Sequence, residues 1–187
     1  MVKRKACVFI SGTGTNLLSI IKNSRDYNFP ANINLIITNN KNAGGINFAK
    51  KFSIPYKIIE KSKREFEKLA IKELRERKIE LLCLAGFMRI LTKSFIRNFK
   101  GRIINIHPSL LPKYKGLNTF ERVLKKGDNI TGCTVHLVNE KLDGGKAIVI
   151  KRVDVKKTDN IKKLKKKVQI EEYKAYQIEI RKIFSFN

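Results

Sequence analysis

Three side chains in the sequence have the types and the spacing for chemistry at a carbonyl group. Asn105 and His107 stand two residues apart in I-N-I-H-P-S, which reads as the end of a buried strand, and Asp143 precedes a pair of glycines. Because residues i and i+2 of a strand point to one face, we expect the amide and the imidazole to lie side by side, with the neighbouring isoleucines in the core. Pro108 should end the strand, since it cannot donate to the ladder.

Each of the three groups has a role in a reaction that builds negative charge on an oxygen atom. An amide donor such as Asn105, aimed at that oxygen, is worth about 2.7–4 kcal/mol in the transition state. An imidazole such as His107 can carry protons, with a typical gain of about 10²–10⁴-fold. The carboxylate of Asp143 would favour the protonated imidazole and fix its orientation. No Ser-His or Cys-His signature accompanies them, so we expect direct transfer rather than a covalent acyl-enzyme.

Structural explanations remain open for this trio of Asn105, His107 and Asp143. A histidine in a strand is more often a hydrogen-bonded structural residue, and an aspartate before Gly-Gly is usually a turn former. His136, in the alternating run G-C-T-V-H-L-V, shares a face with Thr134 and is interpreted as a structural or supporting residue.

A glycine turn, G-T-G-T-N at residues 12–16, follows the first apolar run. In open α/β sheets ligands bind beyond the carboxyl ends of the strands, and glycines let the amides that open a helix approach an anion. A phosphate site is one interpretation, and a plain strand-to-helix turn is the other. The turn is not a dinucleotide fingerprint, because Leu17 replaces the third glycine, and it lacks the G-K-[ST] of a Walker loop.

The elements that must position these residues follow from hydrophobic periodicity. Short continuous apolar runs predict strands covered on both faces, and apolar residues at helical spacing predict helices between them. The alternation predicts a single domain over 1–187: a Rossmann-like α/β open sheet, mostly parallel, with helices on both faces and an antiparallel strand pair toward the C-terminal part. Strands are expected at 6–11, 33–38, 56–59, 81–85, 102–106, 132–138 and 147–155. Helices are expected after the glycine turn, from 45 to about 52, and at 64–77, 92–99, 120–126 and 160–184.

The formal charge of +25 at pH 7 has two explanations. One is a nucleic acid or another polyanionic partner, which positive potential would recruit. The other is the bias of an AT-rich genome, which pushes replaceable surface positions toward Lys and Asn. We favour the second and expect no nucleic-acid role, because lysines are scattered over almost every segment apart from a cluster at 162–167.

Localisation and partners follow from what the chain lacks. No apolar run is long enough to span a membrane, and the basic opening MVKRKACVFISG leads into the glycine turn rather than a cleavable segment. Cys7, Cys83 and Cys133 have no C-x-x-C spacing and are predicted to be reduced core thiols. We expect a cytoplasmic protein with small-molecule substrates, no metal and no membrane partner, as a monomer or weak homodimer.

Four motifs resemble those of the phosphoribosylglycinamide formyltransferases, the folate-dependent enzymes of purine synthesis. They are I-S-G-T-G-T-N-L at 10–17, L-A-G-F-M-R-I-L at 84–91, I-N-I-H-P-S-L-L-P-K-Y-K-G-L-N-T at 104–119 and L-D-G-G at 142–145. The resemblance covers essentially the whole chain, and the N-I-H-P-S-L-L-P block is highly specific. It implies formyl transfer from 10-formyltetrahydrofolate to the amine of glycinamide ribonucleotide through a tetrahedral intermediate.

The resemblance also implies a role for each site residue. The trio becomes catalytic: Asn105 stabilises the oxyanion, His107 is the general acid, and Asp143 orients His107 and raises its pKa. The residues implied to bind the ribonucleotide are Gly14, Thr15, Asn16 and Glu172. Those implied to bind the folate are Arg64, Met88, Arg89, Ile90 and Leu91, together with Asn105.

The chain departs from the family's pattern at four positions. Asn118 replaces a usual histidine, Lys115 replaces a proline, and Tyr173 and Gln177 interrupt a stretch of the terminal helix. These changes put rate and affinity in doubt more than reaction type.

Other interpretations of the sequence assign the same fold to another enzyme, or assign the chain to a different class of function. A methionyl-tRNA formyltransferase would explain the charge, but we expect it to carry a further carboxy-terminal domain. A formyltetrahydrofolate hydrolase would carry a further amino-terminal one. An inactive relative or a nucleic-acid binder would show no transfer and a steep salt dependence of binding.

Overall fold

The computed structural model describes residues 2–185 and contains seven strands and six helices in that range. The strands are β1 (Arg4–Ile10), β2 (Ala31–Thr38), β3 (Tyr56–Ile58), β4 (Leu81–Leu84), β5 (Arg102–His107), β6 (Ile130–Leu137) and β7 (Ala147–Asp154). The helices are α1 (Thr15–Ser24), α2 (Gly45–Lys51), α3 (Lys63–Glu76), α4 (Lys93–Asn98), α5 (Thr119–Lys126) and α6 (Ile161–Ser185). Every element expected from the sequence is present, with ends that differ by a few residues at most.

The strands form one ladder in the order β3-β2-β1-β4-β5-β6-β7. Strand β1 pairs parallel with β2 and β4, and β2 pairs parallel with β3, while β6 and β7 are antiparallel. The predicted fold class, a mostly parallel Rossmann-like sheet with an antiparallel pair near the C-terminal end, is therefore confirmed.

The chain divides into two compact units. The first unit comprises Met1–Ile104 and Ile180–Asn187, and the second comprises Asn105–Glu179. A single domain over 1–187 stays a prediction.

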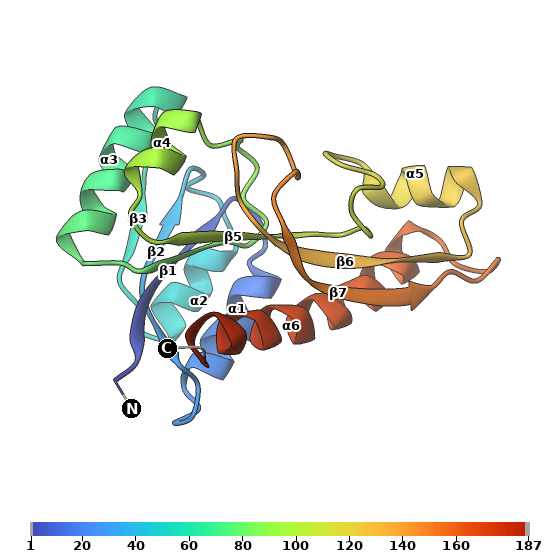
Figure 1. Ribbon diagram of the computed structural model, residues 1–187, viewed down its shortest axis with the longest axis horizontal. Coiled ribbons are helices and arrows are strands. Elements are labelled where there is room, and N and C mark those ends of the chain that lie inside the picture. The colour runs from blue at the N-terminus through green and yellow to red at the C-terminus, as the bar shows by residue number, and fades with distance from the viewer. Residues whose placement is uncertain (1, 186–187) are drawn as a thin grey trace. The chain divides into compact units, whose positions relative to one another are not determined.

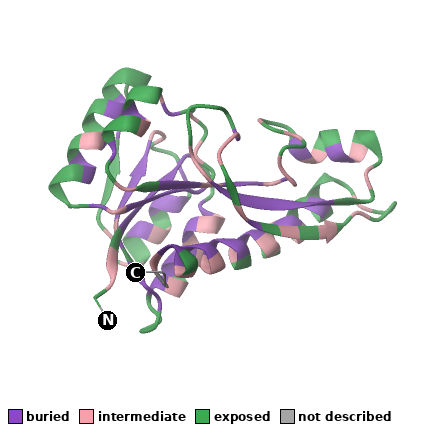
Figure 2. Ribbon diagram, in the orientation of Figure 1, coloured by how far each residue is buried: buried purple, intermediate pink, exposed green. Residues whose placement is uncertain are grey.

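The first unit is built around β1 and β4, whose side chains are buried on both faces. Residues 6–10 are entirely inaccessible to solvent, as is most of β4, which explains why these strands lack polar alternation. Helices α3 and α4 lie on one side of these strands and α1 and α2 on the other (Figure 1), and Figure 2 shows the buried strands between them. Helix α3 begins at a capping box, in which Ser62 Oγ accepts from the Glu65 amide and donates to the Glu65 carboxylate.

The second unit consists of the end of β5, helix α5, the β6–β7 pair and most of α6. The residues of β6 from Thr131 to His136 are buried, whereas β7 alternates between exposed and covered positions. Helix α6 buries Leu164, Val168, Ala175 and Tyr176, which recur at helical spacing and form the stripe that covers the sheet.

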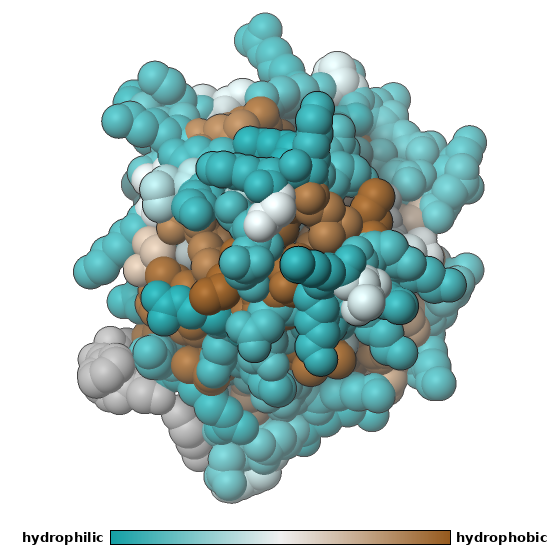
Figure 3. Space-filling view, turned by 90° about the vertical axis from the view of Figure 1, so that its right-hand side faces the viewer, coloured by the Kyte–Doolittle hydropathy of each residue, from teal (hydrophilic) through white to brown (hydrophobic). Residues whose placement is uncertain are grey.

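The surface is rich in charged side chains, as the composition predicts. Figure 3 shows a face on which hydrophilic side chains predominate and apolar patches lie between them. All three cysteines are free and buried, as predicted. None of the helices in the described range is both long and apolar enough to cross a bilayer.

Candidate active site

Strand β5 places two of the trio on one side and two isoleucines in the core. Ile104 and Ile106 are buried, while Asn105 is half-buried and His107 is 6% exposed, and the strand ends at His107, just before Pro108. The alternation predicted from the sequence is thus present, and the proline stands where the ladder stops.

Asp143 brings the trio together. Its Oδ2 lies 3.4 Å from His107 Nδ1, and its Oδ1 accepts from Asn105 Nδ2 at 3.5 Å. The carboxyl group is nearly buried, and the backbone amide of Gly116 donates to Oδ2 at 2.9 Å. A side-chain amide, an imidazole and a carboxylate therefore converge within this second unit.

The pKa of Asp143 is the result of opposing influences. Burial by itself would raise the pKa of this carboxyl group. The hydrogen bonds from His136 and from the Gly116 amide, together with the charges of His107 and His136, outweigh burial, so the pKa lies below its ordinary value. Asp143 is consequently ionised at neutral pH, although little of it reaches solvent.

The hydrogen bonds of His107 determine where its protons are. Nε2 lies 2.7 Å from the carbonyl oxygen of Tyr114, and a carbonyl can only accept, so Nε2 carries a hydrogen. Nδ1 then faces the carboxylate of Asp143 at 3.4 Å. The ring of His107 is thus held between a carbonyl oxygen and a carboxylate.

His136 lies closer to the site than the sequence indicated. Its Nδ1 donates to the Leu137 carbonyl at 2.8 Å, while Nε2 lies 3.3 Å from Asn105 Nδ2 and 3.6 Å from Asp143 Oδ1. Nε2 accepts from Asn105 when the ring is neutral and can donate to Asp143 when it is charged. The supporting role predicted for His136 therefore takes the form of direct contact with two members of the trio.

The loop from Pro108 to Gly116 is attached to β6 by a buried hydroxyl group. Thr134 Oγ1 accepts from the Leu111 amide at 3.1 Å and donates to the Ser109 carbonyl at 2.7 Å. Ser109 Oγ in turn donates to the Lys113 carbonyl at 2.6 Å. These bonds hold the loop that supplies the Tyr114 carbonyl and the Gly116 amide. Sequence reasoning missed both groups, because backbone atoms leave no signal in residue types.

A second anchor fixes the ring of Tyr114. Its hydroxyl donates to Asp128 Oδ2 at 2.8 Å, and the guanidinium of Arg122 lies 5.3 Å from the ring centroid. Tyr114 itself adopts a left-handed backbone conformation with φ 56°. The two side-chain contacts offset the cost of that conformation.

The turn that carries Asp143 is shaped by Gly145. A Cβ atom at Gly145 would come 1.7 Å from the Leu137 carbonyl oxygen, so only glycine allows the turn to approach the end of β6 this closely. Asp143 has φ 45°, a left-handed conformation that aspartate tolerates better than most residues.

Glu172 lies on the buried stripe of α6, next to Cys133 of β6. Burial, followed by the charges of Glu172 and Glu171, raises the pKa of the Cys133 thiol to about 12. Cys133 is therefore a protonated thiol at neutral pH. The assignment of Glu172 to the substrate amine stays a prediction.

In the first unit, the glycine turn joins β1 to α1. Gly14 is the N-cap of α1 with φ 78°, and a Cβ there would lie 2.5 Å from Gly45 Cα, so the turn packs directly against the start of α2. This contact explains Gly14 by packing alone. The phosphate role of Gly14, Thr15 and Asn16 stays a prediction.

The residues expected to bind the folate also lie in the first unit. Met88 and Ile90 are 68% and 59% exposed, whereas Leu91 is buried. The guanidinium of Arg89 lies 5.5 Å from the Phe66 ring centroid and donates to the Lys61 carbonyl at 2.9 Å. The segment therefore exposes apolar side chains beside the start of α3, the helix that carries Arg64.

The family follows from a comparison with known proteins. The family model described as formyl transferase matches residues 4–180, which is nearly the whole chain. The chain belongs to the formyl transferase family.

Named relatives of this formyl transferase include a phosphoribosylglycinamide formyltransferase from Haemophilus influenzae, 39% identical over 95% of this chain and 86% of that protein. The human trifunctional purine biosynthetic protein adenosine-3 is 38% identical over 98% of the chain, but the chain spans only 18% of that protein's length. A crystal structure of phosphoribosylglycinamide formyltransferase from Brucella melitensis aligns with a TM-score of 0.92 at 34% identity, covering 100% of this chain and 97% of that one. The resemblance drawn from the four motifs is therefore confirmed.

Four positions of this formyl transferase depart from the family's pattern, and the structure shows the local role of two of them, Asn118 and Lys115. Asn118 is the N-cap of α5 in a left-handed conformation, φ 54°, which asparagine adopts more readily than most residues. The Lys115 carbonyl accepts from Arg122 at 2.7 Å. Tyr173 and Gln177 are half-buried on α6.

Proposed function

We propose that this formyl transferase moves the formyl group of 10-formyltetrahydrofolate to the amine of N1-(5-phospho-D-ribosyl)glycinamide, a step of purine (IMP) biosynthesis. The observation that carries the proposal is the carboxylate of Asp143, which contacts both the imidazole of His107 and the amide of Asn105. The names of the relatives support the ribonucleotide as acceptor, the motif resemblance supports the folate as donor, and the contacts support the chemistry.

The reaction requires one bond to form and one to break. The substrate amine attacks the formyl carbon, and the carbonyl oxygen acquires negative charge in a tetrahedral intermediate. Asn105 donates to that oxygen, and the charged His107 stabilises it as well. His107 gives a proton to the folate nitrogen as the carbon–nitrogen bond breaks, and the attacking amine loses a proton, so the ring is recharged over the cycle.

The ring of His107 must exchange a partner during this cycle. Both nitrogens face protein groups, the Tyr114 carbonyl on one side and Asp143 on the other. A proton can reach a substrate only after one of these contacts gives way. The contact with Asp143 involves a charged carboxylate, whereas the contact with Tyr114 involves a neutral carbonyl and is the more readily exchanged one.

The binding residues of the proposal come from the family resemblance. Gly14, Thr15, Asn16 and Glu172 would hold the ribonucleotide. Arg64 and the segment 88–91, with Asn105, would hold the folate. We further propose a cytoplasmic enzyme that acts without a metal ion on small molecules, as a monomer or weak homodimer.

The net charge favours a second acceptor, the initiator methionyl-tRNA, because a polyanion gains most from a surface of +25. The test is to incubate purified protein with 10-formyltetrahydrofolate and either glycinamide ribonucleotide or initiator Met-tRNA. We expect formylation of the ribonucleotide alone. Formylation of the tRNA alone, or of neither acceptor, would overturn the proposal.

A further inference from the structure

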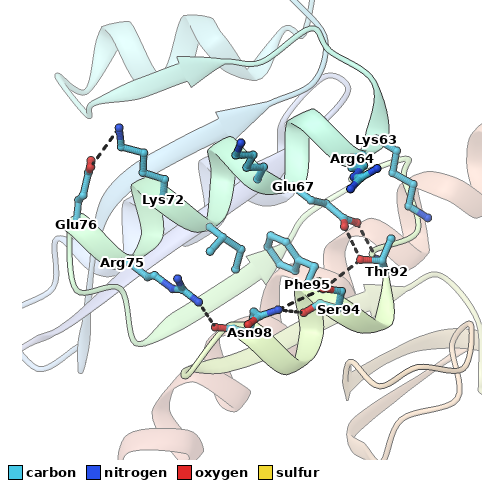
Figure 4. A pocket seen from close by; sticks show the side chains of 12 residues that line it. Lys63, Arg64, Glu67, Lys72, Arg75, Glu76, Thr92, Ser94, Phe95 and Asn98 are labelled. Carbon is cyan, nitrogen blue, oxygen red and sulfur yellow. Dashed lines mark hydrogen bonds and ion pairs between the residues drawn. The ribbon is translucent and has the colours of Figure 1, made fainter.

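A groove of about 840 Å³ lies between α3 and α4 in the first unit, and Figure 4 shows Lys63 and Arg64 at one end of it. Arg64 is one of the residues proposed to bind the folate, so this groove adds no separate site. The second unit contains a contact on which the proposed mechanism depends, between the carbonyl group of Tyr114 and the ring of His107. The groups that hold this carbonyl in place lie outside the trio.

The direction of the Tyr114 carbonyl depends on the backbone torsion angles of Tyr114 itself. The carbonyl oxygen lies 2.7 Å from His107 Nε2. Tyr114 adopts φ 56°, a left-handed conformation that a bulky aromatic residue rarely takes up. Relaxation to an ordinary conformation would turn the carbonyl group and break its contact with His107. Such a conformation persists only where the surrounding structure holds it.

The side chain of Tyr114 is held at its far end by Asp128, fourteen residues further along the chain. The phenol hydroxyl donates to Asp128 Oδ2 at 2.8 Å. Asp128 follows Gly127, the C-cap of α5, and β6 begins two residues after Asp128. The bond therefore ties the loop that follows β5 to the short connection between α5 and β6.

The bond between Tyr114 and Asp128 joins a neutral phenol to an ionised carboxylate. The hydrogen bond from the phenol is the main cause that holds the pKa of Asp128 below its ordinary value. Burial, and then the hydrogen bond to Asp128, raise the pKa of the Tyr114 phenol, so the hydroxyl keeps its hydrogen at neutral pH. Lys113 adds a long ion pair of 3.6 Å to the same carboxylate oxygen. A hydrogen bond to a charged acceptor is stronger than one between two neutral groups.

Arg122 of α5 holds the same segment of the loop. Its guanidinium carbon lies 5.3 Å from the centroid of the Tyr114 ring. Its Nη1 donates to the Lys115 carbonyl at 2.7 Å. The ring of Tyr114 and the peptide that follows it are thus both fixed by groups on α5 or just beyond its end.

The segment from Tyr114 to Gly116 contacts two members of the trio. The Tyr114 carbonyl faces His107, and the Gly116 amide donates to Asp143 Oδ2 at 2.9 Å. That same Oδ2 lies 3.4 Å from His107 Nδ1. A group that fixes Tyr114 therefore acts on the position of the His107 ring relative to its carboxylate partner.

We propose that Asp128 is a positioning residue for the transfer reaction, and that through the Tyr114 hydroxyl it holds the Tyr114 carbonyl against Nε2 of His107. This inference rests on the proposed function, because it takes His107 as the proton donor. Asp128 acts on the ring through Tyr114 alone, which distinguishes it from the trio. Loss of the bond leaves every member of the trio present but frees the ring of His107 to turn.

The first test removes the bond from either side. Tyr114→Phe keeps the aromatic ring beside Arg122 but deletes the hydroxyl, and Asp128→Ala deletes the carboxylate. Each variant should lower kcat by about ten- to a hundredfold, since a misplacement of about 1 Å can cost about a hundredfold. The KM for each substrate should stay within about twofold of wild type, because the loss concerns the transition state. The double variant should be no slower than either single one, because both changes break the same bond.

Two further variants separate positioning from a general loss of stability. Asp128→Asn retains an oxygen that accepts from the Tyr114 hydroxyl, so it should recover most of kcat. Asp159→Ala is the matched control, because Asp159 is also a largely covered carboxylate, bonded to Lys167 and to the Lys156 amide. It should lower the thermal midpoint and leave kcat unchanged. All rates are measured well below the thermal midpoint of each variant.

A second measurement reads the ring of His107 without any turnover. The chain has two histidines, so imidazole NMR spectra of isotope-labelled protein contain two ring systems, and the His107→Ala variant assigns them. The Nε2 hydrogen of His107 should give a resonance in the wild-type protein and in Asp128→Asn. The same resonance should be lost to exchange with solvent in Tyr114→Phe and Asp128→Ala.

The outcomes distinguish this inference from the proposed function. Loss of the resonance in Tyr114→Phe and Asp128→Ala, in a protein without formyl transfer, would support the hold of Asp128 on the ring and overturn the proposed function alone. Formyl transfer with an unchanged kcat in these variants, or with a rise in KM alone, would overturn the inference and leave the proposed function intact. A resonance that is absent from the wild-type spectrum, or unchanged in the variants, would also overturn the inference, as would an Asp128→Asn variant as slow as Asp128→Ala.

Discussion

The Nε2 atom of His107 lies 2.7 Å from the carbonyl oxygen of Tyr114. This one contact fixes a hydrogen on Nε2, and it leaves Nδ1 to face Asp143. The proposed proton donor is therefore set by a backbone atom seven residues further along the chain, as well as by its carboxylate partner.

Replacing His107 by alanine should remove most of the formyl transfer. The variant lacks the proton donor and the positive charge near the developing oxyanion, so we expect kcat to fall by about 10²–10⁴-fold. Steady-state kinetics with glycinamide ribonucleotide measure this, and circular dichroism checks the fold. Turnover near the wild-type rate would remove His107 from the mechanism.

Replacing Asp143 by asparagine should lower kcat by a similar factor, because the ring of His107 loses the carboxylate that orients it. The change should also alter how the free energy of unfolding depends on pH in acid. The pKa of Asp143 is depressed in the folded state, so its contribution to stability is complete above its unfolded pKa of about 3.9 and is lost as pH falls through the lower folded value. The difference in urea midpoint between wild type and Asp143→Asn should therefore shrink as the pH falls below about 4. A difference that grows on acidification would contradict the assignment.

Replacing Thr134 by valine should loosen the loop that carries Tyr114. The variant keeps the shape of the side chain but leaves the Leu111 amide and the Ser109 carbonyl without their partner, at a cost of about 1–3 kcal/mol. Urea denaturation measures the loss. Thr134→Ser retains the hydroxyl and should recover most of the stability and the activity. A serine variant no better than the valine one would show that the methyl group, and not the hydroxyl, matters here.

Replacing Cys133 by alanine should leave the transfer rate within about twofold of wild type, because a thiol with a pKa of about 12 is not a nucleophile at neutral pH. The rate is compared after confirming the thermal midpoint, since the variant leaves a small cavity. A folded but inactive variant would reopen a covalent route through a thioester.

Strand periodicity made half of the site predictable. Asn105 and His107 alternate with buried isoleucines, and the i, i+2 rule alone places them together. Asp143 was predictable only from the chemistry of its carboxyl group, because it stands 36 positions after His107, with α5 and β6 between them.

The loop contacts could not be predicted in this way. Tyr114, Gly116 and Asn118 all have positive φ, so the loop follows no periodic pattern that a sequence could display. The ring of His136 was assigned to the correct face, but its contacts depend on how the Asp143 turn folds back. The glycine turn at 12–16 presents the opposite difficulty, because the sequence pattern has two explanations. Contact with Gly45 accounts for Gly14 whether or not a phosphate binds.

The motif Asp143-Gly144-Gly145 contains one residue that folding requires and one that the proposed chemistry requires. The close approach of Gly145 to the Leu137 carbonyl identifies the first. A descendant that gave up formyl transfer would still need a residue without a side chain at position 145 in order to fold, whereas the left-handed backbone at position 143 would accept asparagine or glycine as well as an acid. Gly145 is thus a marker of ancestry, and the aspartate, in the role that we propose for it, is the better marker of a working catalyst.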